Sequence, residues 1–300
     1  MHQDVFRYKS LNSLQLLNDL FWVVTSLNLL NQDLPEFKEE IGIDLIEDRE
    51  KKAFSIWFQA LCENPFLLES YFNSEDQLIL GKYFERLVQF FFENYPRYEL
   101  LIAGKQFFDR KTTLGELDFV IRDKTKNEVL HLEVAVKYYM GYKSSPKHSM
   151  WIGPNGLDTL EKKLTKFERQ LALSISEESN IDFKIDRRIA LLKGFFFIHW
   201  RAKVWPHFHI NSLENGEWMY EEEMGSALDD NGRYIIFPKH LWLSFYLDPE
   251  TKSAAKPDIM MKVSDQINTI KKGIMLVMID EKEHKVLAKK LVVPSKWPRL

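Results

Sequence analysis

The stretch GELDFVIRDKTKNEVLHLEVAVK, residues 115–137, constrains the fold of this chain more than any other. Two runs rich in β-branched and aliphatic residues flank the polar sequence DKTKN, and this pattern predicts a β-hairpin. Asp118, Glu133 and Lys137 interrupt these otherwise apolar runs. Because an isolated carboxylate in a buried strand costs several kcal/mol, the sequence predicts that both acids have partners.

Hydrophobic periodicity on either side of the hairpin predicts the order of the other elements. Apolar residues recur at helical spacing over 13–30, 47–65, 81–96 and 155–175. Strand patterns cover 98–109, 114–123, 128–140 and the continuous apolar run 187–200. The central order is therefore helix, three strands, helix and strand, which predicts an α/β core with helices packed on a mixed sheet.

The chain has 300 residues, enough for one large domain or two modest ones. We expect three parts: a helical N-terminal layer over 1–75, the α/β core over 76–200, and a C-terminal extension over 201–300. In the extension, the sequence predicts a short helix at 237–249, another helix within 256–273, and a closing hairpin formed by 273–280 and 284–294.

Composition narrows the class of protein. The formal net charge is -3, which argues mildly against a dedicated nucleic-acid coat protein. The single cysteine, Cys62, excludes an intramolecular disulfide and a cysteine-based zinc cluster. The N-terminus lacks a signal-peptide pattern, and no run approaches 18 apolar residues without a charge. We expect a cytoplasmic protein without a membrane segment.

The charged residues of the hairpin predict a metal site. Side chains alternate along a strand, so Glu133 and Lys137 share one face, and antiparallel pairing can bring Asp118 close to it. Two converging carboxylates repel each other unless a cation lies between them, and oxygen ligands suit Mg²⁺ or Mn²⁺. The alternative is a solvated ion pair of Lys137 with Glu133 or Asp118, worth about 0–1 kcal/mol.

The same residues carry a resemblance to a known family. A helix with Glu85, a strand with Asp118 and a strand with Glu133 and Lys137 follow the order of the PD-(D/E)XK nuclease superfamily. The longer pattern resembles the bacterial DUF1853 family over roughly residues 80 to 300. The matching segments are GKYFE (81–85), GELDFVIRD (115–123), HLEVAVKYY (131–139), WIGPN (151–155), LLKGFFF (191–197) and VVPSKWP (292–298).

The resemblance implies a restriction-endonuclease-like core and a set of roles. Asp118 would be the first metal-binding acid, Lys137 the lysine of the second motif, and Glu85 the helix glutamate that supports the metal. One position departs from the pattern, because Ala135 stands where the second acid is usual. Glu133 lies two residues earlier on the same face, about 6.6 Å away at 3.3 Å per residue, so both a shifted ligand and a loss of catalysis are open.

Five further residues are candidates for substrate contact. Lys105 and Gln106 lie on the strand before the hairpin, and the alternative for them is a solvated strand start. Lys163 and Gln170 lie on the predicted helix 155–175, whose basic residues could follow a nucleic-acid backbone or simply face solvent. Trp151, in the loop 142–156, could stack on a base or anchor the loop by packing.

The hypothesis drawn from the sequence is a Mg²⁺- or Mn²⁺-dependent nuclease. Asp118 and Glu133 would hold the metal, Glu85 would support it, and Lys137 would position the attacking water. A catalytically inactive module that binds nucleic acid or protein on the same scaffold is the first alternative. A nucleotide or small-molecule hydrolase that uses the same acids is the second. The sequence leaves the oligomeric state open.

Overall fold

The computed structural model describes residues 6–7, 11–30, 37–73, 77–109, 112–142, 151–175, 181–202, 215–248 and 250–298. The fold is mixed α/β with mostly antiparallel strand pairing. The chain forms two compact units, each built from two chain segments. The first unit comprises 1–136 and 164–193, and the second comprises 137–163 and 194–300. Three elements, β6 (Glu128–Gly141), α5 (Leu160–Leu173) and β8 (Arg187–His199), contribute residues to both units.

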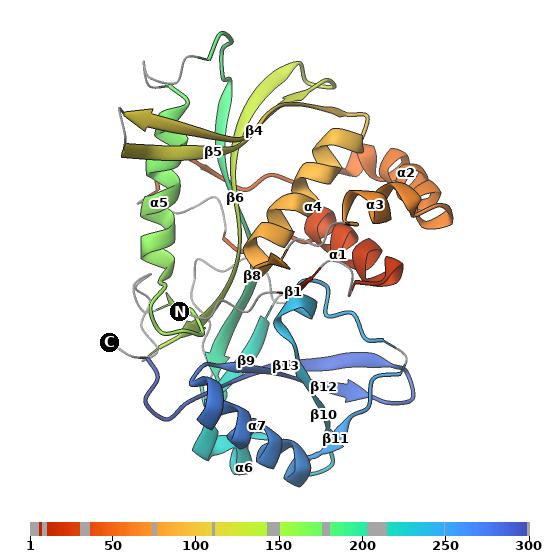
Figure 1. Ribbon diagram of the computed structural model, residues 1–300, viewed down its shortest axis with the longest axis vertical. Coiled ribbons are helices and arrows are strands. Elements are labelled where there is room, and N and C mark those ends of the chain that lie inside the picture. Colours follow the sequence, from red (N-terminus) through yellow and green to blue (C-terminus); the bar gives the residue numbers. More distant parts are fainter. Residues whose placement is uncertain are drawn as a thin grey trace. The chain divides into compact units, whose positions relative to one another are not determined.

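The first unit begins with helices and continues into a meander of strands (Figure 1). Its helices are α1 (Ser13–Thr25), α2 (Lys51–Glu63), α3 (Phe66–Tyr71) and α4 (Leu80–Asn94), with a 3₁₀ turn η2 (Asp48–Glu50) before α2. Its strands are β1 (Phe6–Arg7), β2 (Glu40–Ile41), β3 (Gln77–Leu78), β4 (Tyr98–Asp109) and β5 (Thr112–Asp123), together with the parts of β6 and β8 in this unit.

Helix α4 joins the helical part of this unit to its strands. Its core stripe is fully buried and consists of Phe84, Leu87, Val88 and Phe91. The helix packs against α1 and β4, and the Tyr83 hydroxyl donates to Asp19 Oδ2 of α1 at 2.9 Å. Pro96 follows two residues after its end, as expected for a residue that cannot continue a helix.

The three-stranded meander matches the prediction closely. Strand β4 pairs antiparallel with β5 from Tyr98↔Asp123 to Asp109↔Thr112, and β5 pairs antiparallel with β6 from Asp123↔Glu128 to Phe119↔Leu132. The short β2 adds to β8 in parallel, with Glu40 opposite Ile189. Figure 1 shows α1–α4 gathered beside the strands of this unit.

The second unit is a sheet with helices packed on it. Its elements are β7 (Trp151–Ile152), β9 (Asn215–Tyr220), η5 (Glu221–Glu223), α6 (Met224–Ala227), β10 (Arg233–Phe237), η6 (Lys239–Leu241), β11 (Ala254–Ala255), α7 (Lys256–Ile270), β12 (Ile274–Asp280) and β13 (Lys285–Val293). Strand β12 pairs antiparallel with β10 and β13, and β9 lies parallel to both β13 and β8. Ile259, Val263 and Ile267 of α7 pack on this sheet in one buried cluster.

The structure corrects two local expectations. The described residues of the predicted helix 237–249, which are 237–248, do not form a helix: they hold the end of β10 and the 3₁₀ turn η6, and Phe245 has a φ of 53°, outside helical geometry. The helix predicted over 155–175 begins only at Leu160, and Leu157, which precedes it, is 56% exposed. No described helix combines the length and the apolar character that crossing a membrane requires.

Candidate functional site

Asp118 and Glu133 face each other across the hairpin at the point where its ladder ends. The backbone pairing of β5 and β6 ends at Phe119↔Leu132, and Asp118 and Glu133 are the next residues along the two strands. There the side chains supply the missing cross-strand bonds. The backbone N–H of Asp118 donates to Glu133 Oε1 at 3.1 Å, and the backbone N–H of Val134 donates to Asp118 Oδ2 at 2.9 Å. Two buried-strand acids are thus placed next to each other, as the sequence predicted.

A buried histidine supports Glu133 from the same face of β6. The Nε2 atom of His131 lies 3.1 Å from Glu133 Oε1, and its Nδ1 atom lies 2.9 Å from the Oγ atom of Ser174, just beyond α5. His131 and Glu133 are fully buried. Burial is the main cause that lowers the pKa of His131 to about 4, against the opposing effect of the Asp118 charge. The ring is therefore neutral at pH 7.

The neutral ring fixes the direction of these bonds. An ionised carboxylate only accepts, so with Glu133 ionised the Nε2 atom of His131 carries the proton and Nδ1 accepts from the Ser174 hydroxyl. Ser174 Oγ also lies 3.1 Å from Leu171 O, which is the competing acceptor for its single proton. The sequence analysis missed His131 and Ser174. A histidine two residues before Glu133 on the same strand face was the available signal for the first of them.

Glu85, on α4, belongs to an acidic group with residues of β5. Burial raises the pKa of Glu85, and the negative charges of Asp118 and Glu116 raise it further. Lys82, one turn earlier, opposes this effect with its Nζ atom 2.5 Å from Glu85 Oε2. The charges of Asp118 and Glu116 therefore both act on Glu85, and the sequence analysis did not select Glu116 or Lys82. The supporting role of Glu85 at a metal stays a prediction.

The carboxylate oxygens of these acids are of the kind that Mg²⁺ prefers as ligands. Within the described residues, no group of three or more His, Cys, Asp or Glu side chains is arranged to hold a metal ion. Mg²⁺, however, is commonly bound by one or two carboxylates, while waters and substrate phosphates complete its octahedron. Asp118 and Glu85 each carry such a carboxylate, and the charge of Asp118 raises the pKa of Glu85. Glu133 accepts the backbone N–H of Asp118.

Lys137 lies in the second unit, further along β6. Its Nζ atom lies 2.6 Å from Oδ2 of Asp158, and both side chains are about one-third exposed. The ion pair that the sequence offered as an alternative is thus present, but with Asp158, a residue 21 positions later, instead of Glu133 or Asp118. The role of Lys137 in positioning water stays a prediction.

Two of the three substrate-contact candidates of the first unit, Gln106 and Gln170, contact Glu116. Gln106 Nε2 is 3.4 Å from Glu116 Oε2, and Gln170, which is buried, donates from Nε2 to Glu116 O at 3.2 Å. Lys105 places its Nζ atom 5.3 Å from the centre of the Phe107 ring. Gln170 therefore joins α5 to the strand that carries Asp118.

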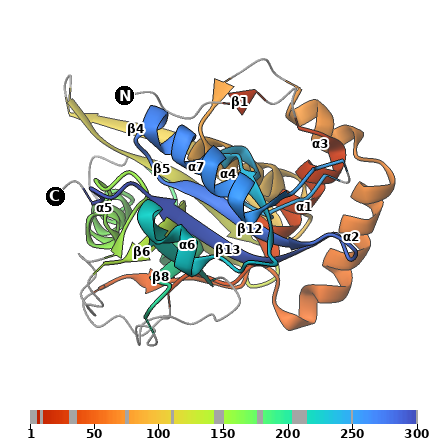
Figure 2. The same ribbon diagram turned by 90° about the horizontal axis from the view of Figure 1, so that it is seen from below.

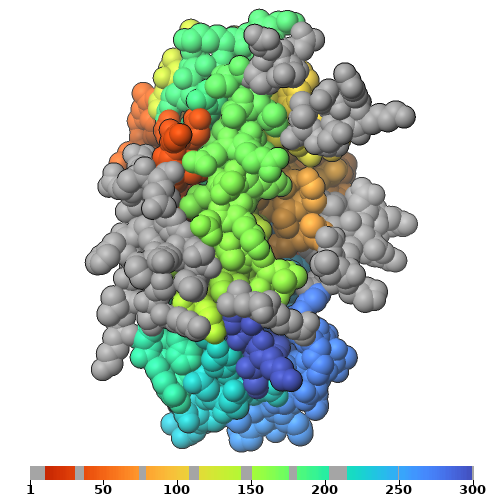
Figure 3. Space-filling model, turned by 90° about the vertical axis from the view of Figure 1, so that its left-hand side faces the viewer, coloured from red at the N-terminus to blue at the C-terminus, as the bar shows by residue number. Residues whose placement is uncertain are grey.

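The two candidates of the second unit have different environments. Trp151 is 3% exposed, and its ring lies 4.5 Å from that of Phe196; these contacts favour the packing alternative over stacking on a base. Residues 143–150 of its loop lie outside the described residues. Lys163 is half-buried on α5, a helix that Figure 3 shows along one face of the molecule.

Comparisons with known proteins identify the family. No curated protein and no solved structure matches the chain. A family model, described as a domain of unknown function (DUF1853), matches residues 18–293. This match spans most of both units, including every candidate residue described above. The chain therefore belongs to the DUF1853 family.

Proposed function

We propose that the protein is a metal-dependent nuclease of the PD-(D/E)XK type, which hydrolyses a phosphodiester bond of nucleic acid with Mg²⁺ or Mn²⁺. One observation carries the proposal: where the β5–β6 ladder ends, the backbone N–H of Asp118 donates to Glu133 Oε1, and the backbone N–H of Val134 donates to Asp118 Oδ2. These two bonds support a carboxylate held in place within β5, where a metal ligand of this fold type would stand. The order of α4, the β4–β6 meander, α5 and β8 supports it as well.

Each residue has a defined part in this proposal. A bound Mg²⁺ would polarise the phosphate and lower the pKa of an attacking water. Asp118 and Glu85 would hold the ion, and Glu133, supported by His131, would orient Asp118 through its backbone N–H. Lys137 would position the attacking water. Four residues remain proposed contacts for the nucleic-acid backbone: Lys105, Gln106, Lys163 and Gln170. Stacking of Trp151 on a base is no longer favoured.

The test is cleavage of plasmid and of labelled oligonucleotides by the purified chain with Mg²⁺, Mn²⁺ or EDTA. We expect metal-dependent strand cleavage that falls at least about 100-fold in Asp118→Asn, because changing even the outer partners of a metal commonly costs about 10–100-fold. Glu99→Gln is the matched control: it removes a half-exposed acid of β4 and should leave cleavage unchanged.

The outcomes separate the alternatives. Equal cleavage by the wild type and Asp118→Asn would refute the proposal. Absence of cleavage, together with absence of Mn²⁺ binding to the wild type, would favour the inactive binding module. Phosphate release from nucleotides without strand cleavage would favour the small-molecule hydrolase. Lys137→Ala tests the lysine separately, since loss of cleavage with retained Mn²⁺ binding is expected from its role.

A further inference from the structure

The end of α5 contacts both strands of the hairpin that carries the proposed metal site. Gln170, in the last turn of the helix, donates from Nε2 to Glu116 O of β5 at 3.2 Å. Ser174, the residue directly after α5, places its Oγ atom 2.9 Å from Nδ1 of His131 on β6. Figure 2 shows α5 alongside β6. Each contacted strand residue stands two positions before one of the two acids that the hairpin brings together, so the helix end meets the hairpin next to its candidate site.

Tight packing fixes where Ser174 stands relative to the hairpin. A Cβ atom added to Gly115 of β5 would lie 2.4 Å from Cδ1 of Leu173, so the leucine occupies the space that a larger residue would need. Leu173 also packs against the buried cluster formed by Phe107, Leu117 and Val120 of the meander. Because Ser174 follows Leu173 directly, the same packing holds its hydroxyl at the strands.

A chain of three hydrogen bonds leads from Ser174 to the backbone of Asp118. The Ser174 Oγ atom bonds Nδ1 of His131 at 2.9 Å, and Nε2 of the same ring bonds Glu133 Oε1 at 3.1 Å. The same Glu133 oxygen accepts the backbone N–H of Asp118 at 3.1 Å. The side chains of Ser174, His131 and Glu133 are at most 5% exposed. Water therefore has little room to replace a lost bond, and removing one partner leaves a buried polar atom short of one bond.

The Ser174 hydroxyl determines how the His131 ring can stand. Rotating the ring by 180° would replace both bonding nitrogens with carbon atoms, which would break its bonds to Ser174 and Glu133. The bond at one ring nitrogen also decides which nitrogen carries the proton: a hydroxyl that donates to Nδ1 leaves the proton on Nε2, facing Glu133. Without the hydroxyl, the neighbouring Leu171 carbonyl, whose hydrogen bond raises the pKa of the ring, favours a proton on Nδ1. Nε2 and Glu133 Oε1 would then face each other as two acceptors.

From these contacts we propose that Ser174 is a positioning residue of the nuclease site, acting on the backbone of Asp118 through the two side chains between them. The carboxylate of Asp118 is carried on that backbone, so its direction towards a metal ion depends on a hydroxyl supplied by the end of α5. The hydrogen-bond chain exists without a metal, whereas its effect on cleavage rests on the proposed function. The first part is therefore tested on the metal-free protein and the second by cleavage.

The experiment measures the tautomer of His131 and the hydrogen exchange of the Asp118 amide by NMR on the full-length, metal-free protein at pH 7. We expect the proton on Nε2 of His131 in the wild type. Ser174→Ala should shift it towards Nδ1 and speed exchange of the Asp118 amide about three- to tenfold, the value of one hydrogen bond. Ser174→Thr, which keeps the hydroxyl, should retain the wild-type tautomer. A proton on Nδ1 in the wild type, or unchanged exchange in Ser174→Ala, would overturn the proposal.

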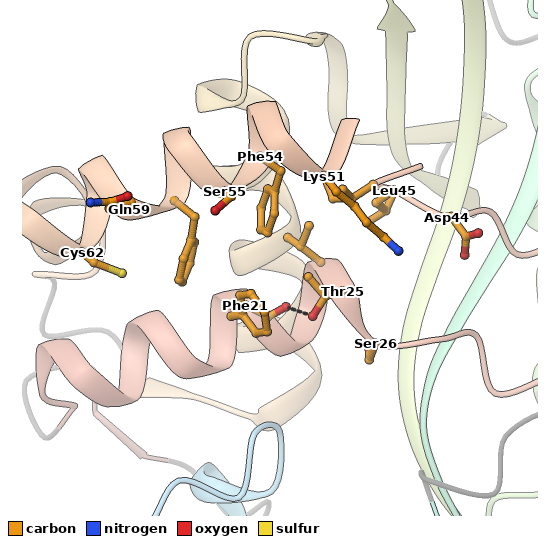
Figure 4. A pocket seen from close by; sticks show the side chains of 13 residues that line it. Phe21, Thr25, Ser26, Asp44, Leu45, Lys51, Phe54, Ser55, Gln59 and Cys62 are labelled. Carbon is orange, nitrogen blue, oxygen red and sulfur yellow. Dashed lines mark hydrogen bonds between the residues drawn. The ribbon is translucent and has the colours of Figure 1, made fainter. Parts of the chain in front are cut away.

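Two controls show whether the effect is local. Ser70→Ala removes a hydroxyl that, like that of Ser174, bonds a backbone carbonyl three residues earlier, at 3.0 Å; it should change neither signal. The helices α1 and α2 of the same unit line a cavity of their own (Figure 4), and their amide exchange should stay at the wild-type rate in Ser174→Ala. Equal acceleration there would show a general loosening of the unit and overturn the proposal.

Cleavage tests the part of the proposal that rests on the nuclease. With Ser174→Ala we expect plasmid cleavage at subsaturating Mn²⁺ to fall about three- to tenfold, because Asp118 is held less firmly. Reduced cleavage with an unchanged tautomer and unchanged exchange would overturn the positioning role. Faster exchange in Ser174→Ala together with no cleavage by the wild type would support that role and refute the nuclease alone, so the two failures are distinguishable.

Discussion

The ion pair between Arg97 and Asp123 makes a quantitative prediction about stability and pH. Arg97 precedes β4, and Asp123 ends β5. Arg97 donates to Asp123 through Nη2 at 2.6 Å and Nε at 3.1 Å, and both side chains are at most 3% exposed. Thr125 donates its backbone N–H and its hydroxyl to Asp123 Oδ1. The aspartate thus anchors the hairpin turn.

The lowered pKa of Asp123 gives the magnitude of the stabilisation by this ion pair. Burial alone would raise it, but hydrogen bonds from Arg97 and Thr125 outweigh burial and lower the pKa from 3.8 to about 2. At 1.36 kcal/mol per pH unit, this difference stabilises the fold by about 2.4 kcal/mol at neutral pH. Because the folded pKa is the lower one, the stabilisation is complete well above pH 3.8 and is lost as the pH falls towards 2.

Asp123→Asn tests this value, since asparagine resembles the protonated acid in shape. We expect urea unfolding to show a loss of about 2.4 kcal/mol at pH 6, shrinking to about 0.8 kcal/mol at pH 2.5. Glu99→Gln, which removes a half-exposed ion pair with Arg122, should change stability by less than about 1 kcal/mol at both pH values. A difference between wild type and Asp123→Asn that is independent of pH would refute the reasoning.

Two further substitutions, one within each unit, test the packing inside that unit by urea unfolding. Phe167→Ala on α5 should cost about 3–5 kcal/mol, because the side chain is fully buried; a cost below about 1 kcal/mol would contradict this packing. Gly194→Ala should destabilise the protein by more than about 1 kcal/mol, because Gly194 has a φ of 132° and an added Cβ would lie 1.8 Å from Lys137 O; wild-type stability would contradict that contact.

The spacing of apolar residues along the chain predicted much of the fold, because apolar side chains are the ones that become buried. The hairpin around DKTKN shows two runs of β-branched and aliphatic residues on either side of a polar turn, and α4 shows an apolar stripe with a period of 3.6 residues; the bounds predicted from both patterns were close. Strands β9 and β10 have only six and five residues, too short for such a pattern to stand out from the neighbouring loops. The predicted helix at 237–249 failed because apolar spacing alone does not report the conformation of Phe245.

The candidate site was predictable only in part. The pairing of Asp118 with Glu133 followed from hairpin register, which is local. The partners that come from distant segments did not: Ser174 reaches His131 from 43 residues away, and Asp158 pairs with Lys137 across a loop. A sequence pattern shows that a buried charge needs a partner, but tertiary packing decides which residue supplies it.

The interleaved construction of the two units has a consequence for protein synthesis. A ribosome releases the chain from its N-terminus, yet the first unit includes residues 164–193, which follow the opening segment of the second. The nascent first unit therefore lacks α5 and its part of β8 until Lys193 has emerged. During that interval the strands around Asp118 and Glu133 have neither Ser174 nor Gln170 to complete their contacts.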